Sequence, residues 1–119
     1  MKITVLGDPI IKKNTKKFSC RGGYPRTYYS KRWLEWEEYA LIQLKMIKVD
    51  TYKTLSTISL KFFPKTARRF DLTNMAEGIQ DVLVKAEIIA DDSWKVMPKV
   101  IIEFGGIDKT NPRTEVEIR

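Results

Sequence analysis

The chain has 119 residues, 43% of them hydrophobic, which predicts one domain over residues 1–119 with a buried core. It has no apolar run near the roughly 18 residues that a membrane-spanning helix requires and no apolar leader at its start, so we expect a cytoplasmic protein. A single cysteine excludes an internal disulfide, and the absence of histidine excludes serine-protease-like triads, histidine general bases and histidine-ligated zinc.

The net charge of +7 is unevenly distributed along the chain. Residues 1–70 hold 16 Lys and Arg against 5 Asp and Glu, a balance of +11, whereas residues 71–119 hold 6 against 10, a balance of −4. A strongly basic half is typical of proteins that bind a polyanion, and a separate acidic segment suggests a separate site. The alternative is that the basic surface only promotes solubility.

The first half of the chain contains one predicted strand and one predicted helix. Alternation of polar and apolar residues predicts a strand over 2–7. Residues 10–26 are rich in Lys, Arg, Gly and Pro, and we expect a loop that stays mobile until it meets a partner. Apolar residues then recur at helical spacing behind the N-cap residue Ser30 and predict a helix over 30–48. Trp33 on this helix is expected to face the core or a dimer interface.

The second half contains three predicted strands and a second helix. Alternation predicts a strand over 55–63, and helical spacing predicts a helix over 71–86 with Asp71 as its N-cap. Two further strands are expected over 99–104 and 114–119. The resulting order, β-α-β-α-β-β, predicts a single α+β domain in which a mixed four-stranded sheet packs with two helices.

Carboxylates cluster around the second predicted helix. Asp71 and Glu77 belong to a polar stripe on this helix, and Asp91-Asp92 follows after a hydrophobic turn, from which it could fold back beside the helix start. Mg²⁺ is held by carboxylate, water and phosphate oxygens, so two or three carboxylates from separate elements suffice for a metal site. The alternative is that the stripe is the solvated side of an amphipathic helix and that the acidic pair is only a turn.

Basic residues before this helix and in the first loop are candidates for holding a nucleic-acid backbone. Arg68-Arg69 precedes Asp71 directly, and guanidinium groups can contact a phosphate in a bidentate manner. The loop over 10–26 is expected to follow a duplex arm through its phosphates. The candidate DNA-binding residues are Lys12, Lys13, Lys16, Lys17, Arg21, Arg26, Arg68 and Arg69.

The motif RRFDLTN at 68–74, followed by IIADDS at 88–93, resembles the RusA family of Holliday junction resolvases. The resemblance implies a Mg²⁺-dependent endonuclease, with Mn²⁺ able to substitute, that acts as a homodimer on four-way junctions and other branched DNA during recombination and repair. It also implies a phage or prophage origin in a bacterial host cell. It implies, further, that Asp71 and Asp92 ligate the metal with Asp91 adjacent.

Two positions depart from the family pattern. Thr73 stands where the family has a second aspartate, and Glu77 stands where the family has a lysine needed for activity. Thr73 and Glu77 are one helical turn apart, so Glu77 can place a carboxylate near the position of the missing aspartate. We therefore expect Asp71, Glu77 and Asp92 to be catalytic and, with Asp91, to hold the metal. The alternatives are a junction-binding protein without catalysis and a relaxed nuclease for other branched DNA.

Overall fold

The computed structural model describes residues 1–12, 16–19 and 26–119, with the backbone alone for 16–19 and 26–28. The helices and strands are β1 (Lys2–Leu6), β2 (Lys16–Ser19), β3 (Arg26–Tyr29), α1 (Lys31–Lys45), β4 (Ile58–Phe63), α2 (Leu72–Lys85), β5 (Val100–Phe104) and β6 (Arg113–Ile118). The predicted order is confirmed, with β2 and β3 added between the first strand and the first helix. Within the described residues no helix is long and apolar enough to cross a membrane.

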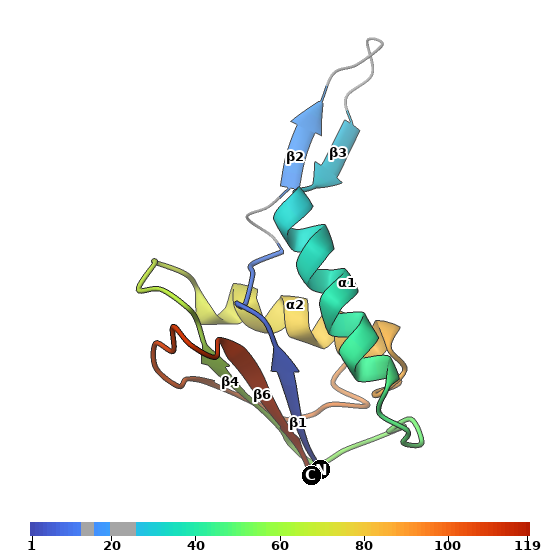
Figure 1. Cartoon of the computed structure of the whole chain (residues 1–119). Helices are drawn as coiled ribbons and strands as arrows, with labels where there is room; N and C mark the ends of the chain where they lie inside the picture. The colour runs from blue at the N-terminus through green and yellow to red at the C-terminus, as the bar shows by residue number, and fades with distance from the viewer. Residues whose placement is uncertain (13–15, 20–25) are drawn as a thin grey trace.

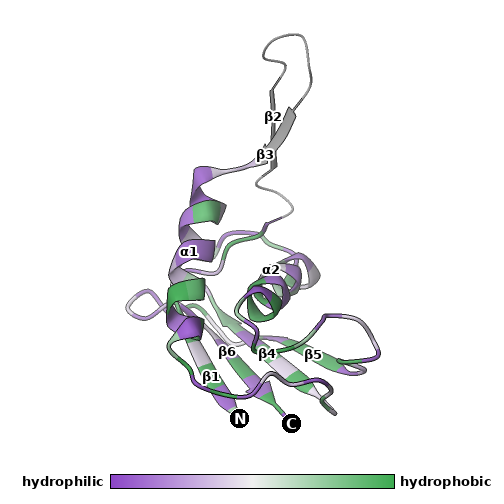
Figure 2. Cartoon of the chain, turned by 90° about the vertical axis from the view of Figure 1, so that its right-hand side faces the viewer, coloured by the Kyte–Doolittle hydropathy of each residue, from purple (hydrophilic) through white to green (hydrophobic). Residues whose placement is uncertain are grey.

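Four of the strands form one mixed sheet in the order β1-β6-β4-β5. β6 pairs antiparallel with both of its neighbours, whereas β4 pairs parallel with β5, and α2 is the crossover between these two strands. Both helices lie on the same face of the sheet (Figure 1 and Figure 2). The expected α+β fold, with a mixed four-stranded sheet packed with two helices, is therefore confirmed.

One hydrophobic core lies between the helices and the sheet. Ile58, Leu60 and Phe62 alternate along β4 and are buried on the helix-covered face. Trp33 of α1 is 0% exposed, and Gly78 of α2 makes room for it, because a Cβ atom at that glycine would lie 3.0 Å from ring atom Cζ3. The core position expected for Trp33 is confirmed.

The segment between β1 and α1 is more regular than its composition indicates. We expected a loop over 10–26, but β2 and β3 form an antiparallel pair that extends beyond the start of α1 (Figure 1). The expectation is wrong for residues 16–19 and for Arg26. The two strands read KKFS and RTYY, and their aromatic and β-branched residues favour strands although lysine and arginine dominate the segment.

Several element boundaries differ from expectation by one to three residues. α1 ends at Lys45, three residues before the expected end. β4 begins at Ile58, three residues after the expected start, and the reciprocal backbone hydrogen bonds between Thr57 and Arg119 continue its pairing with β6 by one residue. β6 covers Arg113–Ile118, one residue earlier than expected.

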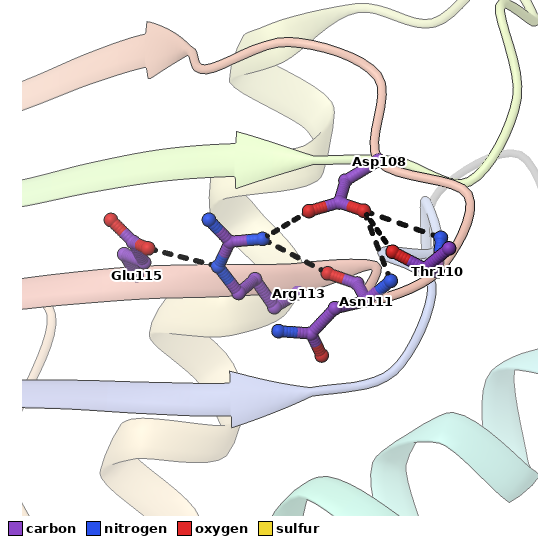
Figure 3. Close-up of polar contacts among 5 residues, drawn as sticks. All are labelled: Asp108, Thr110, Asn111, Arg113 and Glu115. Atoms are coloured by element: carbon purple, nitrogen blue, oxygen red, sulfur yellow. Dashed lines mark hydrogen bonds and ion pairs between the residues drawn. The ribbon is translucent and has the colours of Figure 1, made fainter.

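The loop that joins β5 to β6 is fixed by a network around Arg113 (Figure 3). Arg113 donates from Nη1 to Asp108 Oδ2 at 2.8 Å and from Nε to Glu115 Oε2 at 2.9 Å. Asp108 Oδ1 accepts the backbone N–H groups of Thr110 and Asn111. The hydrogen bond from Arg113, followed by that from Asn111, lowers the pKa of Asp108 below its ordinary value of 3.8.

We expect Asp108→Asn to destabilise the fold at neutral pH and to have a decreasing effect in acid. The folded-state pKa of Asp108 is depressed, so its carboxylate contributes stability that is present above the ordinary value of 3.8 and is lost as the pH falls through the folded-state pKa. Urea unfolding of the parent and the variant at neutral pH and at successively lower pH measures this. A difference between the two proteins that stays constant with pH would contradict the role of Asp108.

Candidate active site

Of the four carboxylates expected to hold a metal, Asp71 directly precedes α2, Glu77 lies within it, and Asp91 and Asp92 follow it. Asp71 is the N-cap residue, and its Oδ1 accepts the backbone N–H of Thr73 at 3.0 Å and the Thr73 hydroxyl at 2.6 Å. Asp91 and Asp92 are exposed in the turn after the helix. Because α2 connects two parallel strands, it begins at their C-terminal edge and ends at the opposite edge (Figure 1). The 14 residues of α2, about 21 Å at 1.5 Å per residue, separate the two groups.

The expectation that Asp91-Asp92 folds back beside the helix start is wrong. Ile89 forms a parallel bridge with Tyr52, and the N–H of Ala90 donates to the Tyr52 carbonyl at 2.9 Å. These contacts hold the acidic turn beside the segment that leads into β4. Across the described residues, no three of the His, Cys, Asp and Glu side chains are placed to hold one metal ion. Carboxylate oxygens are suitable donors for Mg²⁺, but the part of the chain that the structure describes does not gather three such side chains at one point.

Glu77 lies on the same side of α2 as Thr73. It is exposed, and helical side chains lean toward the N-terminus, so its carboxylate extends over the turn that contains Thr73. Asp71 precedes Glu77 by six residues and lies outside the helix as its extended N-cap residue, so helical periodicity does not place the two side chains together. Glu77 lies one turn from Thr73, as it must if its carboxylate is to replace the aspartate that the family has at position 73. This placement does not by itself bring the Glu77 carboxylate close to that of Asp71.

A shallow hollow lies at the start of α2. It is lined by Arg69, Phe70, Asp71 and Asn74. Phe70 is half-buried and packs against Phe104 of β5, with the ring centroids 6.1 Å apart. The Phe70 ring thus supports the wall of the hollow, and Arg69 and Asp71 contribute one basic and one acidic residue to its lining. The guanidinium has the charge to contact a phosphate group, and the carboxylate has the charge to bind a cation.

The two arginines before α2 have different surroundings. Arg68 donates from Nη1 to Asp8 Oδ2 at 2.8 Å and from Nη2 to the carbonyl of Pro9, and Asp8 Oδ1 accepts the N–H of Lys65. Arg68 therefore joins the loop after β4 to the segment after β1. Arg69 is exposed and has no ion pair with any residue that the structure describes. Arg69 is thus the better placed of the two to contact DNA.

We expect Arg68→Ala to lower the free energy of unfolding by about 1–2 kcal/mol, because Asp8 loses a charged hydrogen-bond partner. Arg69→Ala is the matched control and should change stability by less than about 0.5 kcal/mol. Urea unfolding of both variants beside the parent measures the difference. Equal destabilisation by the two changes would show that the contact between Arg68 and Asp8 does not fix the loop.

The remaining candidate DNA-binding residues lie around β2 and β3. Lys12 Nζ donates to Asp81 Oδ2 at 3.0 Å and lies 4.8 Å from the centroid of the Tyr29 ring and 5.6 Å from that of Trp33. Lys12 therefore anchors this segment to both helices. Lys16 and Lys17 belong to β2 and Arg26 to β3, whereas Lys13 and Arg21 lie outside the described residues.

Two residues of interest were not singled out from the sequence. Asp8 holds Arg68 across a separation of 60 residues, and such a non-local pair leaves no signal in a single sequence. Trp94 lies directly after Asp91-Asp92-Ser93 and is 75% exposed. Its position beside the acidic motif was a signal that was available in the sequence.

A family model described as endodeoxyribonuclease RusA matches residues 7–119. The matched range contains both ends of α2 and all four of the carboxylates discussed above. Among curated proteins, none matches the chain.

Proposed function

Because this chain belongs to the RusA family of endodeoxyribonucleases, we propose that it resolves Holliday junctions by paired, Mg²⁺-dependent phosphodiester cleavage. The observation that carries the proposal is the family match over residues 7–119, which includes the acidic positions at both ends of α2. A role in DNA recombination and repair in the bacterial cytoplasm follows from the same proposal.

We propose that Asp71, Glu77, Asp91 and Asp92 hold the metal ion, with Mn²⁺ able to substitute for Mg²⁺. Protein sites for Mg²⁺ commonly use one or two carboxylates, with water and substrate phosphate oxygens in the other positions. When bound, the ion supplies a Lewis acid for the scissile phosphate and lowers the pKa of an attacking water. Arg69, at the rim of the same hollow as Asp71, would hold a flanking phosphate.

The separation of the carboxylates supports a homodimer in which each site takes ligands from both chains. Asp71 directly precedes the 14-residue helix α2 and Asp92 follows its last residue by seven positions, so a site at the start of α2 in one chain would take its Asp92 from the acidic turn of another chain. A two-fold axis would then produce two equivalent sites, as paired cleavage requires. Leu34 and Ile42 of α1 and its C-cap residue Met46 are 50%, 55% and 77% exposed, and these apolar side chains offer a surface for association.

The basic strands would bind the arms of the junction. Lys16 and Lys17 on β2 and Arg26 on β3 lie in a pair of strands that extends away from the sheet (Figure 1). Contacts of this kind are made mainly to phosphates and weaken steeply as salt is added. Lys13 and Arg21 belong to the same basic segment of the sequence.

One observation favours a second candidate, a junction-binding protein without catalysis. The hydroxyl of Thr73 donates to Asp71 Oδ1 at 2.6 Å. Thr73, which stands in place of the family's second aspartate, therefore occupies an oxygen of Asp71 that a metal ion would otherwise use. A hydroxyl cannot replace the charge of the missing carboxylate at a metal site. A relaxed nuclease that acts on other branched DNA would use the same residues.

Cleavage of three labelled substrates tests these candidates. We expect a synthetic four-way junction to be cut in Mg²⁺ and not in EDTA, and a duplex of the same sequence to remain intact. Tight junction binding with no cleavage in Mg²⁺ or Mn²⁺ would support the binding protein. Equal cleavage of a flap substrate and the junction would support the relaxed nuclease.

A further inference from the structure

Trp94 is the exposed member of the three tryptophans. Trp33 and Trp36 are 0% and 7% exposed, whereas Trp94 is 75% exposed. An indole is among the largest apolar groups that a protein can bury, and exposed aromatic side chains often mark a binding surface. The position of Trp94 directly after the acidic turn places this surface next to Asp91 and Asp92.

The backbone that carries Trp94 is fixed on both sides. The N–H groups of Val96 and Met97 donate to the carbonyl of Ser93 at 3.1 and 2.9 Å, which closes a single turn around Trp94. The N–H of Leu55 donates to the Val96 carbonyl at 2.9 Å, and Met97 is buried at 4% exposure. An aromatic ring on a fixed turn loses little conformational entropy when it binds a partner.

The surroundings of Trp94 match a nucleotide better than a protein surface. Lys95 Nζ lies 5.9 Å from the centroid of the Trp94 ring, and both side chains are exposed. The ammonium group lies over one face of the ring, so the opposite face can stack on a base while the ammonium group contacts the adjacent phosphate. The aromatic anchors of protein interfaces are instead surrounded by contacts that exclude water. The residues that flank Trp94 here are polar, since Ser93 precedes it and Lys95 follows it.

We propose that Trp94 stacks on a nucleobase at the branch point of the DNA, beside the carboxylates Asp91 and Asp92. This inference rests on the proposed function, because it requires branched DNA as the ligand. When the arms of a junction are open, the bases at the branch point expose a face. In a continuous duplex the neighbouring base covers that face. Stacking on Trp94 would fix the position of the strand near the metal site and would favour junctions over duplex DNA.

Binding of a labelled four-way junction to the parent, Trp94→Ala and Trp94→Phe tests the proposal. Loss of base stacking should weaken junction binding by Trp94→Ala roughly 5- to 150-fold, whereas Trp94→Phe retains a ring and should bind within a few-fold of the parent. A junction with abasic sites at the branch point keeps the phosphates and removes the bases, so it should bind the parent and Trp94→Ala equally. Urea unfolding checks that both variants are folded.

Tryptophan fluorescence gives a second readout of the same contact. The parent should show quenching on addition of the junction, and Trp94→Phe, which retains Trp33 and Trp36, supplies the background signal. Junction binding by the parent without this quenching, or equal affinity of Trp94→Ala, would overturn the inference while leaving the proposed function intact. A changed oligomeric state in Trp94→Ala would assign the ring to an interface between chains and would also overturn it. Absence of binding to any DNA would overturn the inference and the proposed function together.

Discussion

Replacing Asp71 with Asn is expected to lower the rate of junction cleavage at least roughly 100-fold, because a bound metal ion contributes several kcal/mol of charge stabilisation in the transition state. Asparagine is as good an N-cap residue as aspartate, so its side-chain oxygen can still accept the N–H of Thr73 that Asp71 accepts at 3.0 Å. The variant should therefore keep its stability and its affinity for the junction. Single-turnover cleavage, urea unfolding and junction binding measure the three quantities.

Two further variants show whether the effect is specific. Glu87→Gln removes an exposed carboxylate just after α2 and should cleave at the parent rate. Glu77→Gln is expected to lower cleavage, because Glu77 is proposed to supply the carboxylate that Thr73 lacks. An Asp71→Asn variant that cleaves normally would exclude Asp71 from the metal site, and an unaffected Glu77→Gln variant would exclude Glu77 alone.

Replacing Trp33 with Ala is expected to lower the free energy of unfolding by about 3–5 kcal/mol. Trp33 is 0% exposed, and its ring lies 5.2 Å from the Trp36 ring and 6.5 Å from the Tyr29 ring, measured between centroids. Removal of the indole leaves a cavity between α1 and α2 that the surrounding core fills only in part. A loss of this size is a large fraction of the roughly 5–15 kcal/mol that stabilises a typical domain.

Trp94→Ala is the matched control for Trp33→Ala, because it makes the same substitution at a side chain that is 75% exposed. It should change the free energy of unfolding by less than about 0.5 kcal/mol. Urea unfolding followed by circular dichroism measures both variants. A similar loss of stability in the two would contradict the assignment of Trp33 to the core.

The features that the sequence predicts correctly are those that local periodicity determines. Alternation along 58–63 identifies the buried face of β4, and helical spacing places Trp33 in the core. Asp71 is recognised as an N-cap because the helix begins directly after it. In each case the physical cause lies within a few residues of the feature.

The features that the sequence does not predict depend on distant contacts. The acidic turn around Asp91 is held by Tyr52, and the loop before α2 is held by the pair of Asp8 and Arg68. The order of the elements along the chain does not reveal that β4 and β5 are parallel neighbours. Because they are, the two ends of α2 lie at opposite edges of the sheet. The sequence therefore does not reveal that α2 separates Asp71 from the acidic turn within one chain.

The most direct measurement is cleavage of a supercoiled plasmid with an extruded cruciform by a mixture of Asp71→Asn and Asp92→Asn chains that have been refolded together. The parent should linearise the plasmid in Mg²⁺ by paired cuts, and each variant alone should leave it intact. If each site takes Asp71 from one chain and Asp92 from the other, a mixed dimer has one intact site and one site that lacks both carboxylates. We predict that the mixture produces nicked circles in Mg²⁺. A mixture as inactive as the separate variants would contradict a site shared between two chains.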